Sequence, residues 1–368
     1  MIEQAPEPRT GGYVIDFWGA GYDIVEKMGL MPRIEEAAYR VQEVRFVDSQ
    51  GRRESGFSAD VLRRMTNNRL TSLRRSDLAS ALLSAVEDRV ETLFGDSIAS
   101  IEPGADSVRI AFDHAAPREV GLVIGADGLH SRVRRLAFGP DERFETSLGL
   151  HVAACDVKGY PHRDDRVYLS HTRVGRQISR FSMRDDRTLF LFIFRDDEFE
   201  GAIPKTDAGY RDALHLIFGN DGWESAEILA AMDSAEDLYF DRVSQIRMDR
   251  WTRGRTALIG DAAACVSLLA GEGTGLAITE AYVLAGELAR ANGDHDAAFA
   301  AWQGRMLPFL MKKQRSALKY ASTFAPASRL GLMLRNLALQ LFRIPIVADH
   351  LLGSDLRDEI EVPDYAWP

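Results

Sequence analysis

The chain has 368 residues, of which 46% are hydrophobic and 27% are charged, and its formal net charge is −10. This length is enough for about two globular domains with a sizeable core, and the negative charge argues against nucleic acid as a partner. The only cysteines, Cys155 and Cys265, form neither a disulfide framework nor a metal-ligand pattern, so we predict no metal site. Because the sequence has no long apolar run and no signal-peptide pattern, we expect a cytoplasmic protein without a transmembrane segment.

Strand and helix patterns alternate in the first part of the chain. They predict a strand over 12–16, a helix over 23–37, an alternating strand over 41–51 and a helix over 72–89 capped by Ser72 or Ser76. Residues 98–125 alternate between apolar and polar positions, which indicates a β-meander that returns to a buried strand. This layout predicts an α/β fold.

The middle of the chain is rich in strands. Several strands are predicted over 146–200, and the Asp-, Gly- and Arg-rich turns between them indicate an antiparallel sheet. Helices near 207–220 and 224–233, a strand over 256–262 and a helix from about Gly275 to Ala291 follow.

The last part of the chain, 295–352, is predicted to be helical, with breaks at Pro308, Pro326 and Pro345. The segment 329–353 is apolar with scattered arginines, so an interfacial membrane helix and a dimer contact are alternatives. We favour a helix packed over the strand-rich middle of the chain, which we expect to bind the substrate. We expect a monomer or a homodimer.

Sheet segments from both ends of the chain flank the strand-rich middle, which predicts a discontinuous first domain. We therefore expect a discontinuous α/β domain with an inserted antiparallel β-sheet domain and C-terminal helices. The predicted parts are 1–145 with an excursion into the second domain near 40–70, 146–245, 246–295 and 296–368.

One stretch, 255–288, has the pattern of a ligand site. An apolar strand ends at Asp261, and a loop with Gly271, Gly273 and Gly275 leads into a helix. Ligands of open α/β sheets bind beyond the carboxyl ends of strands, and a helix N-terminus attracts negative charge. An ordinary strand, turn and helix is the alternative for this stretch alone.

A second stretch, 122–139, repeats the strand and turn. Its Gly-Ala-Asp-Gly turn leads to Ser131, which is placed as a helix cap, and to a helix with Arg132, Arg134 and Arg135. These arginines equally suit a solvated helix face.

Together the two stretches resemble the class A flavin-dependent aromatic monooxygenases, the group related to para-hydroxybenzoate hydroxylase and the tetracycline-degrading monooxygenases. GADGLHSRVR at 125–134 looks like the DG motif of that family, and GDAAACVSLLAGEGTGLA at 260–277 looks like its GD motif. The sequence departs from the family at Ala264, where a histidine is expected, and lacks the expected proline near Val266 to Leu268.

The resemblance implies that the first domain has a Rossmann-like fold, shortened at its N-terminus, and that it holds an FAD site. It implies that Asp261 hydrogen-bonds the ribityl chain, that Gly271, Gly273 and Thr274 lie against the pyrimidine edge of the isoalloxazine, and that Arg75 reaches the phosphate and ribityl region. No catalytic side chain is assigned by it.

It also implies that Asp127 and Gly128 serve FAD and NAD(P)H binding, and that Glu3 accepts both hydroxyls of the adenosine ribose. The G-x-G-x-x-G turn expected about 20 residues before that acid is not in the sequence. Our expectation is a misplaced start site, and the alternative is a truncated chain with impaired FAD binding.

The implied reaction is hydroxylation of a small aromatic or polyketide-like substrate by FAD, NAD(P)H and molecular oxygen. A flavin-dependent reductase or dehydrogenase of the same fold and a non-catalytic remnant are alternatives, whereas the absence of a Trp-x-Trp-x-Ile-Pro signature argues against a halogenase.

His151, His171 and Tyr168 are conceivable general bases. The FLFIF run at 190–194 and Met183 either line the substrate cavity or belong to the sheet core.

Overall fold

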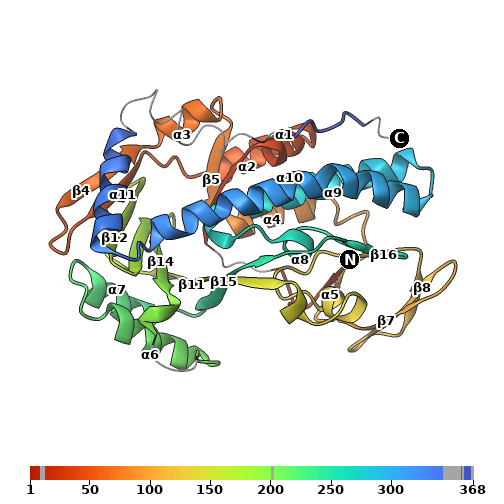
Figure 1. Cartoon of the computed structure of the whole chain (residues 1–368), viewed down its shortest axis with the longest axis horizontal. Helices are drawn as coiled ribbons and strands as arrows, with labels where there is room; N and C mark the ends of the chain where they lie inside the picture. The colour runs from red at the N-terminus through yellow and green to blue at the C-terminus, as the bar shows by residue number, and fades with distance from the viewer. Residues whose placement is uncertain (9–12, 200–202, 343–357, 359, 366–368) are drawn as a thin grey trace.

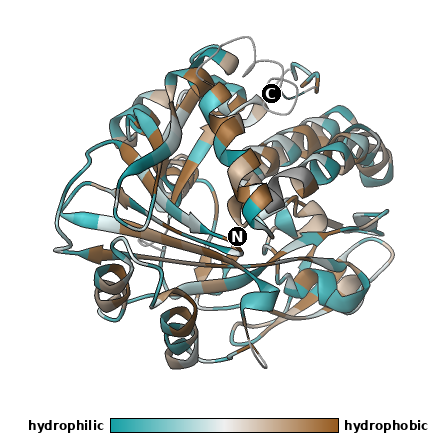
Figure 2. Ribbon diagram, turned by 60° about the vertical axis from the view of Figure 1, so that its left-hand side comes forward, coloured by the Kyte–Doolittle hydropathy of each residue, from teal (hydrophilic) through white to brown (hydrophobic). Residues whose placement is uncertain are grey.

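The computed structural model describes residues 1–8, 13–199, 203–342, 358 and 360–365. Figure 1 shows a large sheet beside a group of smaller sheets and helices, with the long helix α10 (His295–Phe324) running across both. In Figure 2 the inner strands carry mostly hydrophobic residues and the outer turns mostly hydrophilic ones. The mixed α/β fold expected from the sequence is confirmed.

The largest sheet has seven strands in the order β15-β11-β14-β13-β12-β3-β4. The strands β12 and β3 run parallel, and the other neighbouring pairs run antiparallel. Two strands from the first part of the chain therefore extend a sheet built mainly from its middle. The seven strands are β3 (Glu43–Val47), β4 (Arg53–Ser58), β11 (Glu145–Lys158), β12 (Val167–Arg173), β13 (Arg176–Ser182), β14 (Arg187–Arg195) and β15 (Tyr239–Ile246).

Side chains alternate across this sheet, as the two-residue period of a strand requires. Phe190, Phe192 and Phe194 of β14 pack on the helices α6 (Asp207–Phe218) and α7 (Ser225–Met232). Leu189 and Leu191 lie on the opposite face, which borders a cavity. The FLFIF run is thus mostly sheet core. Met183 is buried in a separate cluster with Phe181 and Leu189 and is not among the residues that line the cavity.

The smaller sheets are short. The strands β1 (Ile2–Glu3) and β6 (Leu93–Phe94) pair in parallel, as do β10 (Val123–Gly125) and β17 (Thr256–Leu258). The predicted meander is present in residues 98–120, and β2 pairs with β5 in an antiparallel ladder. The remaining strands are β2 (Val14–Trp18), β5 (Leu70–Arg74), β7 (Ile98–Pro103), β8 (Val108–Phe112), β9 (Arg118–Val120) and β16 (Thr252–Arg253).

Two helix predictions are wrong in the N-terminal region. Residues 23–37 do not form one helix, because Gly29 at φ 74° separates α1 (Ala20–Lys27) from α2 (Met31–Ala37). Ser72 is not a helix cap but pairs with Asp16 in the β2–β5 ladder, so α4 (Arg75–Ser84) begins only at Arg75. Pairing with a distant strand overrides the local helical pattern there.

The predicted break at Pro308 is also wrong, because α10 continues through it. The break at Pro326 is confirmed, since α10 ends at Phe324 and α11 (Arg329–Leu341) follows, and Pro345 lies outside the described residues. The helix α11 packs on β4, at the edge of the seven-stranded sheet, through Leu339. No described helix has the length and apolarity needed to cross a membrane.

The other helical segments are short except for one. The longer one, α9, starts at Gly273 and packs against α1 and α10. The remaining helical segments are α3 (Asp60–Met65), α5 (Arg132–Ala137), η1 (Asp141–Arg143), η2 (Asp196–Glu198), α8 (Asp261–Ala264), η3 (Leu268–Ala270) and α9 (Gly273–Arg290).

Candidate active site

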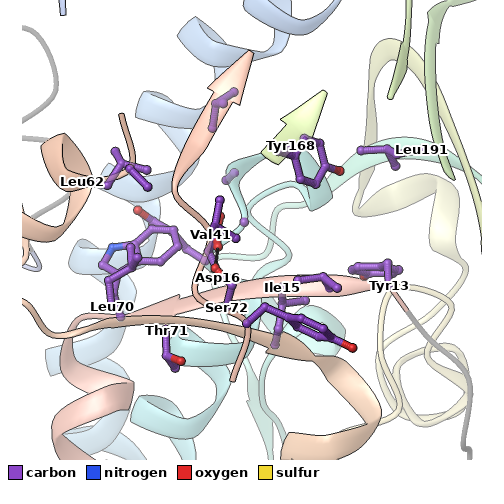
Figure 3. A pocket seen from close by; sticks show the side chains of 18 of the residues that line it. Tyr13, Ile15, Asp16, Val41, Leu62, Leu70, Thr71, Ser72, Tyr168 and Leu191 are labelled. Carbon is purple, nitrogen blue, oxygen red and sulfur yellow. Dashed lines mark hydrogen bonds between the residues drawn. The ribbon is translucent and has the colours of Figure 1, made fainter. Parts of the chain in front are cut away.

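A cavity of about 1110 Å³ lies between the seven-stranded sheet and the β2–β5 pair. Its walls come from distant parts of the chain, including the η3 loop, α10 and α11, and Figure 3 shows some of the side chains that line it. The sheet contributes apolar side chains to this wall, among them Val152, Ala154, Leu189 and Leu191. Large and mostly apolar cavities with a few polar groups are typical of small-molecule sites.

Gly271 and Glu272, which directly precede α9, line this cavity. Gly271 lines it with φ 71°, a conformation that favours glycine, and its missing Cβ would lie 3.7 Å from the ring of Trp18. Among the described residues no side chain caps α9, so the N–H groups of its first turn, including that of Thr274, are available to a ligand.

Asp261 lies beside this helix start. A Cβ on Gly273 would come 3.5 Å from Asp261 Oδ1, so the carboxyl group and the first turn of α9 are neighbours. Burial raises the pKa of Asp261, and the Cys265 thiol and the charge of Arg75 oppose that rise. The structure therefore brings together Asp261, Arg75, Gly271, Gly273 and Thr274.

Arg75 reaches this place because α4 starts where β5 ends. Its N–H donates to the carbonyl of Tyr13 (3.1 Å), which leads into β2. Burial raises the pKa of Tyr13, and the nearby Arg75 guanidinium partly opposes the rise. Arg75 thus supplies positive charge close to both Tyr13 and Asp261.

Asp127 has a local structural role in this molecule. Its Oδ1 accepts a hydrogen bond from the Ser131 hydroxyl, and its Oδ2 accepts one from the Val133 N–H (2.9 Å). Ser131 in turn caps α5 as expected, by accepting from the Arg134 N–H (2.9 Å). Gly128 has φ 79°, so the turn before α5 favours glycine at that position.

Glu3 lies in β1, away from the cavity lining. Its carboxylate accepts a hydrogen bond from the Ala5 N–H (2.8 Å). Its predicted contact with ribose stays a prediction, as does the role of Asp127 and Gly128 in cofactor binding.

The three conceivable bases differ in position. Tyr168 lines the cavity, and burial raises the pKa of its hydroxyl. His171 is buried with Nδ1 bonded to the Val47 carbonyl (2.8 Å), and His151 stacks on Phe194 beside α6 and α7. Only Tyr168 of these residues borders the cavity.

The sequence interpretation missed Asp16, whose side chain also lines the cavity. It is the one charged residue in the apolar strand Val14–Trp18. In such a strand a lone acid is the signal that one position faces something other than hydrophobic core.

These observations fit an FAD site at the start of α9. An uncapped helix N-terminus suits an electron-rich edge of a cofactor, and the neighbouring glycines leave room for close approach. A largely buried carboxyl group beside them suits a hydroxyl donor such as that of a ribityl chain.

The chain matches the model of the FAD binding domain family over residues 21–298. It belongs to the class A flavin-dependent monooxygenase family. A flavin-dependent monooxygenase from an unknown prokaryotic organism is 32% identical over 328 residues, which cover 88% of this chain and 83% of that protein. An uncharacterized protein of Mycobacterium tuberculosis, Rv1260, is 40% identical over 321 residues, covering 85% of this chain and 84% of that one.

Solved structures of the family have the same fold. The tetracycline destructase Tet(55) superposes with a TM-score of 0.82 at 29% identity, covering 99% of this chain and 91% of that one. The FAD complex of Klebsiella pneumoniae HpxO with uric acid superposes with a TM-score of 0.77 at 21% identity, covering 96% and 90% of the two chains. The first similarity supports the family, and the second shows the fold alone.

Proposed function

We propose that this flavoprotein hydroxylates a small aromatic or polyketide-like molecule with NAD(P)H and O₂. The observation that carries the proposal is a mostly apolar cavity whose lining includes Gly271 and Glu272, directly before the uncapped start of α9. Asp261 and the charge of Arg75 lie near that helix start. Its volume of about 1110 Å³ suits a substrate of several rings together with part of a cofactor. The neighbours named tetracycline destructases support a multi-ring substrate.

Bound FAD would supply the redox chemistry, taking electrons from NAD(P)H and passing them to O₂. The chain's own residues bind and orient. Asp261 would accept a hydrogen bond from a ribityl hydroxyl, and Arg75 would supply positive charge for the phosphate and ribityl region. The first N–H groups of α9 would stabilise negative charge on the adjoining edge of the ring system.

The sheet side of the cavity would hold the substrate. Val152, Ala154 and Leu191 offer an apolar surface to aromatic rings and exclude water from the reacting groups. Because burial raises the pKa of Tyr168, its hydroxyl stays protonated near neutral pH and serves as a hydrogen-bond donor instead of a base. No side chain is required as a nucleophile.

The test starts with the visible absorption spectrum of the purified chain after incubation with FAD and removal of free cofactor. NADH and NADPH oxidation are then followed with and without aromatic compounds, and products formed under ¹⁸O₂ are analysed by mass spectrometry. Retained flavin and incorporation of one ¹⁸O atom support a monooxygenase. Retained flavin with oxygen-independent product formation would indicate the reductase alternative, and no retained flavin would indicate a non-catalytic remnant.

A further inference from the structure

Asp16 is the charged residue of its strand and lies on the strand face that borders the cavity. Ile15 and Phe17 pack into the apolar cluster with α1, α2 and α4, although Ile15 also borders the cavity. Val14, Asp16 and Trp18 alternate with them and line the cavity. Because side chains alternate along β2, the carboxyl group points to the cavity side of the sheet (Figure 3).

The neighbouring strand holds this carboxyl group in place. Asp16 pairs with Ser72 in the β2–β5 ladder, and the Ser72 hydroxyl donates a hydrogen bond to Asp16 Oδ1. Ser72 is itself buried, and its carbonyl accepts from the Tyr39 N–H (2.6 Å). The position of Asp16 Oδ1 is therefore set by two elements of the fold.

The second carboxyl oxygen has no such partner. In the parts of the chain that the structure describes, no arginine, lysine or histidine forms an ion pair with Asp16, and Ser72 supplies its only hydrogen bond. Burial raises the pKa of the carboxyl group, and that hydrogen bond from Ser72 opposes the rise. The Asp16 side chain remains accessible from the cavity. A ligand that fills this part of the cavity displaces water from the acceptor oxygen, so the ligand must donate to that oxygen or leave it unpaired.

Tyr168 faces the same cavity from β12 and is close enough to Asp16 for the carboxylate charge to contribute to the raised pKa of its hydroxyl. Its ring stacks on Phe181 at 5.8 Å between centroids, which holds the ring on this wall. Asp16 and Tyr168 thus present a hydrogen-bond acceptor and a donor to the same cavity. A ligand hydroxyl can donate to the first and accept from the second.

We propose that Asp16 is a specificity-determining residue, whose free carboxyl oxygen accepts a hydrogen bond from a hydroxyl or N–H group on an aromatic ligand. Ser72 positions the carboxyl group, and Tyr168 is the companion donor. The proposal rests on the proposed function for its aromatic ligand and adds the residue that selects among such ligands. An aromatic ether of the same shape cannot donate to Asp16, so its binding leaves the acceptor oxygen unpaired.

The test compares 2-naphthol, 2-naphthylamine and 2-methoxynaphthalene by calorimetric titration of the FAD-incubated full chain at pH 8, without NAD(P)H. We expect the hydroxyl or the amine, or both, to bind at least about tenfold more tightly than the ether, since hydrogen bonds to charged groups have this strength. Binding by only one of the two donors would identify the hydroxyl or the N–H as the selected group. D16A should abolish the preference.

D60N is the matched control, because Asp60 also lines the cavity but its carboxylate already binds Arg63 (2.6 Å). It should keep the preference. If D16A does not fold, as judged by its melting temperature, D16N takes its place and should reduce the preference, because a neutral amide oxygen is a weaker acceptor than a carboxylate.

Three results would overturn the proposal: equal binding of the ether by the native chain, no binding of any of the three compounds, or a preference unchanged in D16A or D16N. None of these results depends on turnover. Failure of the proposed function appears separately, as absence of retained flavin or of O₂-dependent product.

Discussion

Gly21 of α1 lies directly against Gly275 of α9. A Cβ on Gly21 would come within 2.6 Å of both the Cα and the carbonyl oxygen of Gly275, which is backbone and cannot turn aside. Gly275 itself lies over the Trp18 carbonyl, 3.3 Å from where its own Cβ would be. The two glycines therefore let α1 approach the first turn of α9, where the candidate cofactor site begins.

Replacement of Gly21 by alanine should displace that turn. We expect G21A to lower the free energy of unfolding by about 1–3 kcal/mol, the usual cost of overpacking, and to weaken FAD binding. Denaturant titration and flavin fluorescence titration measure the two effects. The control is G304A on the exposed side of α10, where a Cβ meets open space, and this variant should be neutral or slightly stabilised.

Loss of the Asp261 carboxyl group should weaken FAD binding without lowering the stability of the FAD-free protein. Burial already opposes the charge of this group, so D261A should leave the FAD-free protein as stable as the native chain or more so. FAD affinity should nevertheless fall about tenfold or more, because the proposed hydrogen bond to the ribityl chain is lost. The melting temperature with and without excess FAD is the measurement. A large fall in the melting temperature of the FAD-free variant would contradict this assignment.

The opposite result is expected at Asp127. Its carboxylate binds the Ser131 hydroxyl and the Val133 N–H at the start of α5, so D127A should destabilise the fold by about 1–2 kcal/mol, as loss of a helix cap does. D127N should restore much of this loss, because the asparagine oxygen can still accept. A D127A variant that is as stable as the native chain but binds FAD or NAD(P)H poorly would contradict this structural role. It would support the role in cofactor binding that the resemblance implies.

Glu280 of α9 should make stability depend on pH. Burial raises its pKa to about 8 from 4.5, while its carboxyl group accepts from the Gly260 N–H (3.1 Å). The native state then holds a proton that the unfolded state releases, so this contribution to stability is complete below about pH 4.5 and is lost as the pH rises through about 8.

E280Q keeps an acceptor oxygen for Gly260 but cannot ionise. Its free energy of unfolding, measured by denaturant titration between pH 5 and pH 8, should fall less with rising pH than that of the native chain. E227Q, at an exposed position on α7, is the control and should retain the native pH dependence. Parallel profiles for E280Q and the native chain would show that Glu280 is not the group responsible.

Local sequence patterns predicted several elements of this fold correctly. The strand and helix around Asp261 and the capped helix after Ser131 follow from apolar runs, turn residues and caps, which act between near neighbours in the chain. The errors arose where a distant segment intervened. Ser72 looked like a helix cap, but it lies in a strand because β2, more than 50 residues earlier, pairs with it.

The sequence alone was enough to predict the family, through two motifs. In each motif an apolar strand is followed by an aspartate, a glycine-containing turn or loop and a helix. Those motifs are local, so they can be read without knowing how the chain folds back. The resemblance already implied that Arg75 and Asp261 share a site with the start of α9, and the tertiary structure supplies the geometry of that grouping. The place of Asp16 on the cavity wall was decided only by the tertiary structure. A contact between residues far apart in the chain depends on which strands pair and which helices cross, and the free energy of that packing is not encoded in any short stretch.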